Sequence, residues 1–283
     1  MKEENTKMNF KPAVKWSGSK RSQSNVIIQR FPKTIDTYYE PFCGGCSMLM
    51  RLMLSDISVS KYIISDINSD LIALWNEIKN DPDEVSNNYE IMWHEMNDLD
   101  DDKNRKRDYF CMVRGRYNET HSPYDFMFIM RTTTNGMPRY NRSGKFNNSF
   151  HITRNGIKPQ TLRQIINVWS KLLQENDITF ISQSFEKITT NEGDFIYLDP
   201  PYANTKGMYF GSFDNNELWD WLRIQPAKYV LSYDGISGDD DNTYAVPNDL
   251  WTKHEYITSG NSSFKRTIGN DNDSIVYESL YIK

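Results

Sequence analysis

The chain has 283 residues, of which 38% are hydrophobic, and a formal net charge of −5 at pH 7. This length fits one or two domains, and the acidic total excludes a simple polycation that coats nucleic acid. No apolar run is long enough to span a membrane, and the N-terminus lacks the apolar stretch of a secretory signal, so we expect a cytoplasmic protein without a membrane partner.

The first eighty residues predict alternating strands and helices, which is typical of an α/β domain. Apolar runs indicate the strands, and apolar residues at helical spacing indicate the helices. An Asp-Pro pair at 81–82 ends the last of these helices. In chain order the predicted elements are a strand at Thr37–Glu40, a loop at 41–47, a helix at Met48–Leu54, a strand at Lys61–Ser65 and a helix at Leu71–Ile78.

The middle of the chain predicts helices and carries a local excess of positive charge. Between Lys103 and Asn176 there are 14 Lys and Arg against 4 Asp and Glu, a local charge of +10 that leaves −15 for the other residues. A basic segment in an acidic chain is typical of a protein with a polyanionic partner. Residues 132–150, rich in Asn, Thr, Gly and Arg, predict a loop or hairpin between the helices. The predicted helices include Tyr89–Met96, Tyr109–Tyr117 and Leu162–Leu173.

Strands resume after the helical segment. Apolar runs predict them at Ile178–Ile181, Phe195–Leu198 and Tyr229–Tyr233, and an alternating pattern predicts a last one at Ser274–Lys283. We therefore predict one α/β domain formed by residues 1–80 and 177–283, which an inserted basic, helical domain at 81–176 divides.

The loop after the first strand and the acid that ends the second one indicate a nucleotide-containing ligand. The loop Glu40–Gly45 opens a helix, where backbone N–H groups allow a ligand to approach closely. Asp66 follows Gly45 by 21 residues, about the spacing at which nucleotide-binding α/β domains place the acid that binds ribose hydroxyls. The full G-x-G-x-x-G pattern is missing, so the sequence favours an adenosine-containing cofactor over a dinucleotide.

Cys43 and Cys46 lie in the same loop with C-x-x-C spacing, which is compatible with redox chemistry or with half a zinc site. No second Cys or His pair accompanies them at metal-ligand spacing in the sequence. We interpret both as small loop residues and expect no metal.

The tetrapeptide Asp199-Pro200-Pro201-Tyr202 directly follows an apolar strand. Proline lacks an N–H and fixes φ, so the strand ends in a rigid turn. Ligands of open α/β sheets bind outside the carboxyl ends of the strands. The turn therefore presents a carboxylate and an aromatic ring together, which suits a planar molecule that bears an amine. An ordinary strand-terminating turn is the alternative, and the acid and the aromatic residue favour a binding site.

Four motifs in this order make the chain resemble a Dam-type DNA adenine methyltransferase of the alpha group. The segment from Asn135 to Asn147 also resembles the recognition hairpin of that family, and the resemblance extends roughly from Lys15 to Lys283. The motifs are Lys15-Trp16-Ser17-Gly18-Ser19-Lys20, Tyr39-Glu40-Pro41-Phe42-Cys43-Gly44-Gly45, Ser65-Asp66-Ile67-Asn68 and Asp199-Pro200-Pro201-Tyr202.

The resemblance implies a Rossmann-like, S-adenosylmethionine-dependent α/β fold in which residues 81–176 form the target-recognition domain. It implies transfer of a methyl group to the N6 amino group of adenine in a specific double-stranded DNA sequence, with S-adenosylhomocysteine as the product. It further implies a monomeric bacterial or phage protein that acts in the cytoplasm, with a restriction enzyme as a candidate partner.

The resemblance also implies roles for individual residues. Lys20 would lie near the cofactor carboxylate and Asp66 on its ribose, while Asp199 and the Pro200 carbonyl would accept the amino hydrogens of a flipped adenine. Tyr202 would stack on that base, Tyr140 would enter the vacated stack, and Arg139 would read a guanine edge. The implied cofactor contacts are Trp16, Lys20, Phe42, Gly44, Gly45, Asp66, Phe185 and Asp199, and the implied DNA contacts are Arg139, Tyr140, Asn141, Arg142, Lys145, Lys265 and Arg266.

Two segments depart from the family pattern. Cys46 stands where many relatives have a third glycine or another small residue. Residues 147–151, Asn-Asn-Ser-Phe-His, replace the Asn-Val-Pro-Phe-Gly run that is common in GATC-specific relatives, so the resemblance does not assign GATC as the target.

Other functions stay open on this evidence. The same scaffold could methylate another amino group, such as cytosine N4 or a glutamine side chain. A catalytically silent DNA-binding relative is disfavoured by the intact Asp66 and tetrapeptide. A nicotinamide-dependent oxidoreductase is disfavoured by the tetrapeptide and by the missing G-x-G-x-x-G pattern.

Overall fold

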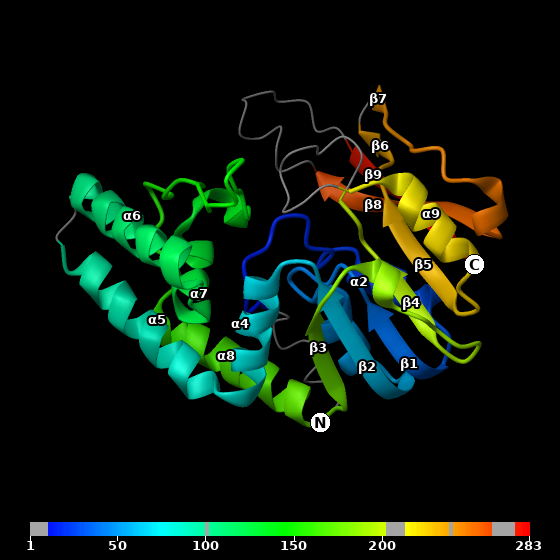
Figure 1. The fold of residues 1–283 in the computed structure, drawn as a ribbon, viewed down its shortest axis with the longest axis horizontal. Helices are drawn as coiled ribbons and strands as arrows, with labels where there is room; N and C mark the ends of the chain where they lie inside the picture. The colour runs from blue at the N-terminus through cyan, green and yellow to red at the C-terminus, as the bar shows by residue number, and fades with distance from the viewer. Residues whose placement is uncertain (1–10, 100–101, 202–212, 238–239, 262–274) are drawn as a thin grey trace.

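The computed structural model describes residues 11–99, 102–201, 213–237, 240–261 and 275–283. A mixed sheet lies at the centre of the molecule (Figure 1). Its strands are β1 (Thr34–Glu40), β2 (Ser58–Asp66), β3 (Ile178–Ser182), β4 (Phe195–Leu198), β5 (Lys228–Tyr233), β6 (Ile236–Ser237), β7 (Asp240–Asp241), β8 (Lys253–Asn261) and β9 (Ile275–Ile282).

The strand order places a topological switch between β1 and β4. The order is β3-β2-β1-β4-β5-β9-β6-β7, with β8 paired to β9. The strands from β3 to β5 are parallel, and β9 runs antiparallel to β5. After β1 the chain builds β2 and β3 on one side and then returns to build β4 and β5 on the other. Such a switch opens a crevice at the carboxyl ends of the two strands.

Helices cover the sheet and form a lobe at one side of it. The lobe comprises α5 to α8, and α4 lies between it and the sheet (Figure 1). The α-helices are α2 (Ser24–Ile27), α3 (Ser47–Met53), α4 (Ser69–Asn80), α5 (Pro82–Asn97), α6 (Lys103–Thr120), α7 (Pro123–Thr132), α8 (Pro159–Gln174) and α9 (Asn215–Arg223). Short 3₁₀ turns lie at η1 (Ile28–Arg30), η2 (Thr134–Gly136), η3 (Phe185–Lys187) and η4 (Asn248–Leu250).

Both faces of the central strands are buried, because successive side chains point to opposite faces. Tyr38 of β1 belongs to a hydrophobic cluster that includes residues of α2, α3, α4 and the helical lobe. Its neighbour Tyr39 belongs to a second cluster, on the opposite face, that is built largely from α9, β4 and β5. This double burial explains why β4 and most of β5 appear in the sequence as continuous apolar runs.

The helical lobe shares the hydrophobic core of the sheet. Trp75 of α4 packs on Trp169 of α8, with ring centroids 4.8 Å apart, and stacks on Phe180 of β3 at 5.9 Å. The Trp169 Nε1–H also donates to the carbonyl of Lys11, 3.0 Å away. The first cluster therefore runs without interruption from the sheet into α5–α8.

Residues 132–150 fold into a hairpin that returns toward the sheet. Antiparallel bridges join Thr133 to Phe150 and Tyr140 to Phe146. The turn is closed by Asn141, whose Oδ1 accepts from the N–H groups of Ser143 and Lys145, each at 3.0 Å. The segment thus has a stable shape although it contains almost no regular strand.

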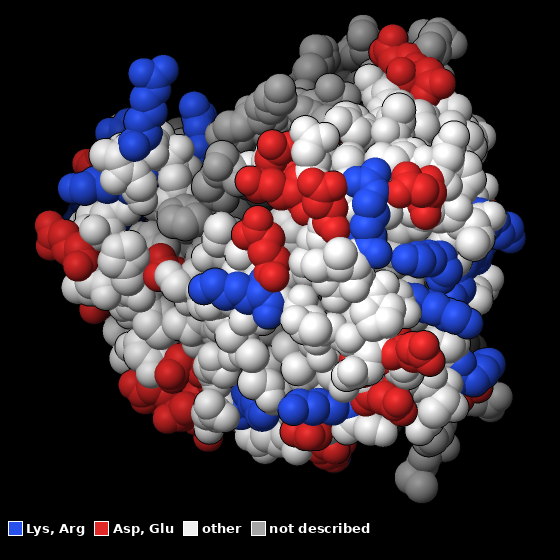
Figure 2. All heavy atoms as spheres, turned by 45° about the vertical axis from the view of Figure 1, so that its right-hand side comes forward, with Lys and Arg blue, Asp and Glu red and all other residues white. Residues whose placement is uncertain are grey.

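The prediction of a mixed α/β fold with a central sheet is confirmed, and α5–α8 and the hairpin lie between α4 and β3 in the chain. Each predicted strand and helix is present, and most bounds differ by one to three residues, but α5 and α6 begin seven and six residues earlier than predicted. The sequence did not reveal α2, α7, α9, β6, β7 or β8. The face that comes forward in Figure 2 carries acidic and basic side chains interspersed. No helix among the described residues is long and apolar enough to cross a membrane.

Candidate active site

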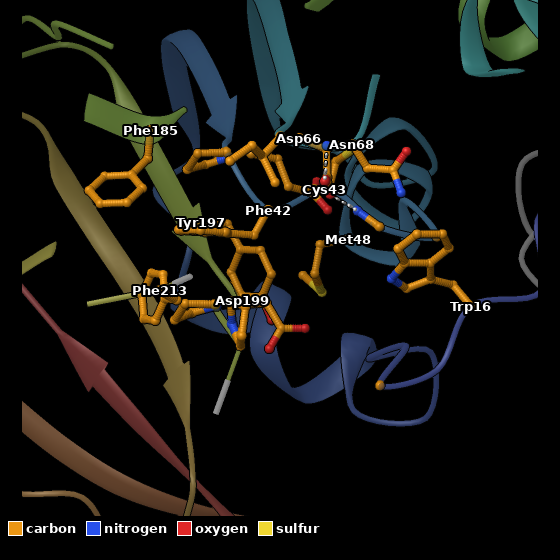
Figure 3. A pocket seen from close by; sticks show the side chains of 18 of the residues that line it. Trp16, Phe42, Cys43, Met48, Asp66, Asn68, Phe185, Tyr197, Asp199 and Phe213 are labelled. Carbon is orange, nitrogen blue, oxygen red and sulfur yellow. Dashed lines mark hydrogen bonds between the residues drawn. The ribbon is translucent and has the colours of Figure 1, made fainter. Parts of the chain in front are cut away.

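A cavity of about 470 Å³ lies at the carboxyl ends of β1, β2 and β4 (Figure 3). One acid comes from each strand end, namely Glu40, Asp66 and Asp199. Parallel strands bring their carboxyl ends to one edge, so acids distant in sequence meet there. The lining includes Trp16, Lys20, Phe42, Cys43, Gly44, Gly45, Met48, Ile67, Asn68, Phe185, Tyr197, Pro200, Pro201, Phe213 and Glu217.

The loop between β1 and α3 approaches the cavity through Gly44. The residue has φ +44°, a left-handed conformation, and a Cβ added there would lie 2.8 Å from atoms of the Trp16 ring. Its N–H donates to Asp66 Oδ2 at 3.1 Å, and its carbonyl accepts from Trp75 Nε1 at 3.0 Å. Only glycine satisfies this backbone and this contact together.

Cys46 occupies the second left-handed position of the same loop, with φ +53°. It is fully buried, directly before α3. This geometry gives a physical reason why a glycine suits the position, and the cysteine accepts a strained backbone there. Among the described residues, no group of three or more His, Cys, Asp or Glu could hold a metal ion.

Asp66 is held in place by backbone donors. Its Oδ2 accepts from the N–H of Gly44 at 3.1 Å and its Oδ1 from the N–H of Asn68 at 3.0 Å. Burial raises the pKa of Asp66 to about 6, and the backbone hydrogen bonds oppose that rise. The carboxylate is therefore ionised at neutral pH and offers acceptor oxygens to hydroxyl groups.

Aromatic rings form one end of the cavity. Phe42 lies 5.5 Å from Phe185 and 5.8 Å from Phe213, measured between ring centroids. Figure 3 shows Phe185 and Phe213 at one end and Trp16 at the other. An apolar end beside an acid suits a flat heterocycle that is joined to a sugar. Phe213 was not predicted, because no sequence motif includes it.

Lys20 and Asp199 form an ion pair inside the cavity. The Lys20 Nζ lies 2.7 Å from Asp199 Oδ1 and 3.8 Å from Glu278 Oε1. Burial alone would lower the pKa of Lys20, but the charges of Asp199 and Glu278 outweigh it and raise that pKa above its usual value. The ammonium therefore stays charged over the physiological pH range.

Glu40 is a site residue that the sequence prediction omitted. It is buried at the end of β1, and its Oε2 accepts from the Tyr38 hydroxyl at 2.8 Å. Burial raises the pKa of Glu40 to about 8; the Tyr38 hydrogen bond opposes the rise and the charge of Asp199 adds to it. Its position at a strand end beside the glycine loop was the signal in the sequence.

The hairpin adjoins the cavity through its base. The carbonyl of Gly136 accepts from the N–H of Ser17 at 3.0 Å. The Tyr140 hydroxyl accepts from Asn68 Nδ2 at 3.1 Å and lies 3.3 Å from the hydroxyl of Tyr117. Tyr140 is half-buried and is bonded to Asn68, which lines the cavity together with Pro138 of the hairpin. The remaining predicted contacts on the hairpin, Arg139, Asn141, Arg142 and Lys145, are exposed.

The structure brings together most of the predicted cofactor and catalytic residues. Trp16, Lys20, Phe42, Gly44, Gly45, Asp66, Phe185, Asp199 and Pro200 all line the one cavity. Three predicted residues, Tyr202, Lys265 and Arg266, lie outside the described residues.

Comparison with known proteins assigns this architecture to a family. The model of the D12 class N6 adenine-specific DNA methyltransferases matches residues 16–257. The chain is 30% identical over 244 residues to the Type II methyltransferase M.MjaIII of Methanocaldococcus jannaschii, covering 80% of this chain and 81% of that protein. It is 27% identical to the Type II methyltransferase M1.LlaDCHI of Lactococcus lactis subsp. cremoris, with 81% and 80% covered. It is 28% identical over 265 residues to the Retron Ec67 DNA adenine methylase of Escherichia coli, with 90% and 85% covered.

Proposed function

The chain belongs to the D12 class of N6 adenine-specific DNA methyltransferases, and we propose that the cavity at the strand ends holds both the methyl donor and the target adenine. As a member of this family it is an S-adenosylmethionine-dependent enzyme that methylates the N6 amino group of adenine in DNA. The observation that carries the proposal is the convergence of Asp66 and Asp199, from two strand ends, on one cavity.

The residues at the β1 and β2 ends fit an adenosine-containing donor. Asp66 offers ionised oxygens to the ribose hydroxyls, and Phe42 and Phe185 offer apolar faces to the heterocycle. Gly44, with Trp16 against it, lets the backbone approach the amino-acid part of the donor. S-adenosylmethionine supplies the methyl group on a positively charged sulfur.

At the β4 end, Asp199 and the carbonyl of Pro200 provide acceptors for the adenine amine. The lone pair of that amine is delocalised into the ring, so the amine is a poor nucleophile. Two acceptors that bind its hydrogens favour a pyramidal nitrogen and stabilise the positive charge that develops on it. A base inside a duplex cannot reach this depth, so the adenine must be flipped out of the helix.

We infer that residues 81–176 recognise the DNA sequence. Within this range, residues 103–176 carry the local charge of +10, and the hairpin, whose Pro138 lines the cavity, exposes Arg139 and Arg142. Arginine binds the major-groove edge of guanine through two hydrogen bonds. The self-closed turn at Asn141 holds these side chains on a defined backbone.

Base-resolution sequencing of DNA from cells that express the protein tests this proposal. We expect N6-methyladenine in one short motif for the native chain. For Arg139→Ala we expect methylation to extend to sites that differ at one base pair, because a bidentate guanine contact gives about tenfold discrimination or more. Arg163→Ala removes the same charge from α8, where Arg163 pairs with Glu90 at 2.9 Å, and should leave the motif unchanged. Methylated cytosine would overturn the site chemistry, and an unchanged motif in Arg139→Ala would remove Arg139 from recognition.

The affinity for S-adenosylmethionine should fall as the pH falls below about 6. The pKa of Asp66 is raised to about 6, so its carboxylate is ionised above that pH and protonated below it. If the ionised form receives the ribose hydroxyls, one unit below the pKa leaves roughly a tenth of the sites competent. Calorimetric titrations between pH 5 and pH 7 should therefore show a loss of about tenfold. Asp66→Asn should bind weakly and independently of pH in this window, and an equal pH dependence in both proteins would contradict the assignment.

A further inference from the structure

Lys20 lies between two carboxylates, and only Asp199 faces the proposed adenine position. Its Nζ is 2.7 Å from Asp199 Oδ1 and 3.8 Å from Glu278 Oε1, and the Lys20 side chain is 5% exposed. Glu278 belongs to β9, on the far side of β5 from Asp199's strand. The buried ammonium also donates to the Gly18 carbonyl at 3.3 Å, so it has a close carboxylate partner, a backbone acceptor and a second carboxylate within reach.

Glu278 has unused capacity to accept hydrogen bonds. Its Oε1 lies 3.5 Å from the Gln23 side-chain amide, which donates to it. Its Oε2 is buried and has no hydrogen-bond partner among the described residues. A buried carboxylate oxygen without a donor is unfavourable, so a charged donor that moved toward Glu278 would be stabilised there.

In the proposed role of Asp199, the Lys20 ammonium and the adenine amine compete for the same carboxylate. The adenine amine needs an oxygen of Asp199 and gains positive charge as it is methylated. A lysine ammonium that stays 2.7 Å from the same carboxylate weakens that acceptor and repels the developing charge. Methyl transfer is therefore faster if Lys20 withdraws from Asp199. Glu278 Oε1 can receive it, because its 3.8 Å distance from the Lys20 Nζ is only about 1 Å longer than a charge-assisted hydrogen bond.

We propose that Glu278 is a positioning residue that draws the Lys20 ammonium away from Asp199 when the adenine amine binds. This inference rests on the proposed function of Asp199. Glu278 does not touch the substrate, and it acts only through Lys20. Gln23, which donates to Glu278 Oε1, holds the acceptor in place.

The test is the variant Glu278→Gln, which keeps the side-chain shape and removes the charge. We expect kcat to fall by about tenfold or more, because the charge-assisted hydrogen bond that Lys20 makes to Glu278 during methyl transfer is lost. Glu278→Asp keeps the carboxylate and should recover part of the rate. Glu255→Gln is the matched control: Glu255 lies on β8, which pairs with β9, and accepts from Arg30 Nε at 2.9 Å. It should retain the native kcat.

A double-mutant cycle shows whether Glu278 acts through Lys20. In a Lys20→Met background, measured in single-turnover assays, Glu278→Gln should cause no further loss, because the ammonium that it positions is gone. A further loss of the same size as in the native background would overturn the inference. A native rate in Glu278→Gln would also overturn it. Equal rates in Glu278→Gln and Glu278→Asp, with thermal midpoints lowered in proportion to activity, would indicate a purely structural role and overturn it as well.

The two proposals can fail separately. If Asp199→Asn kept native turnover in these assays, the proposed function of Asp199 would be wrong, and the inference on Glu278 with it. If Asp199→Asn is inactive and Glu278→Gln is fully active, only the inference on Glu278 is wrong.

Discussion

Replacing Asp199 by asparagine should lower the methyl-transfer rate by about 10²- to 10³-fold, the effect of removing one group that stabilises transition-state charge. The amide keeps the shape of the side chain but loses the negative charge that balances the amine in the transition state. Asp199→Ala, which removes both oxygens, should abolish turnover. Binding of S-adenosylmethionine and of DNA should largely persist, since the contacts proposed for Asp66 and for the hairpin remain.

Incorporation of tritiated methyl groups into duplex DNA measures this effect, with calorimetry for the donor and gel shift for DNA. Asp194→Asn is a matched control near the opposite end of β4. Asp194 is buried, and its carboxylate accepts from the N–H of Thr37 at 3.0 Å and of Asn191 at 2.7 Å. That variant should lose stability and keep its rate per folded molecule. Near-native turnover in Asp199→Asn would refute the assigned role.

Replacing Gly44 by alanine should weaken binding of S-adenosylmethionine by about a hundredfold. A left-handed non-glycine residue costs roughly 1–2 kcal/mol, and the new Cβ would lie 2.8 Å from the Trp16 ring. The loop relieves the backbone strain and the steric contact by moving, and it thereby loses the hydrogen bond from the residue-44 N–H to Asp66. Binding of S-adenosylmethionine must then restore the strained loop conformation. If the backbone strain and the steric contact together cost about 3 kcal/mol, the affinity falls by about a hundredfold.

Gly144→Ala is the matched control, because it replaces a glycine of positive φ outside the loop that approaches the donor. Gly144 also has a positive φ, of +75°, but a Cβ added there meets no atom within 4 Å. Calorimetric titration of both variants with S-adenosylmethionine should therefore show a loss only for Gly44→Ala. Native affinity in Gly44→Ala would mean that the loop does not approach the donor.

The acids of the site could be predicted from the sequence because each one ends an apolar run. A run that ends in Asp66 or Asp199 gives both the strand and the edge of the sheet at which the side chain lies. Glu40 carries the same signal, since it ends the strand that precedes the glycine loop.

The contacts between distant segments could not be predicted. Lys20 lies near the N-terminus and Glu278 near the C-terminus, and only the pairing of β5 with β9 brings them together. No local pattern contains that information. Phe213 likewise reaches Phe42 only through the folded sheet.

Helix α7 escaped prediction for a different reason. Residues 126–130 are all completely buried, so the segment has no polar face and no 3.6-residue period. A short apolar run of this kind does not distinguish a buried helix from a buried strand. The helix start was nonetheless encoded, since Ser122 accepts from the N–H of Asp125 and Pro123 occupies the first turn.

The contact between Trp75 and Trp169 limits how the enzyme can diverge. Trp75 packs on Trp169 of α8, and its Nε1–H donates to the carbonyl of Gly44. The helical insert and the proposed donor-binding loop therefore constrain each other's sequences. A lineage that exchanged the whole insert would have to refit this core at the same time. The hairpin turn, exposed and closed on itself by Asn141, can accumulate substitutions at far lower cost. Under the proposed recognition role of the hairpin, new target sequences therefore arise most readily at this turn.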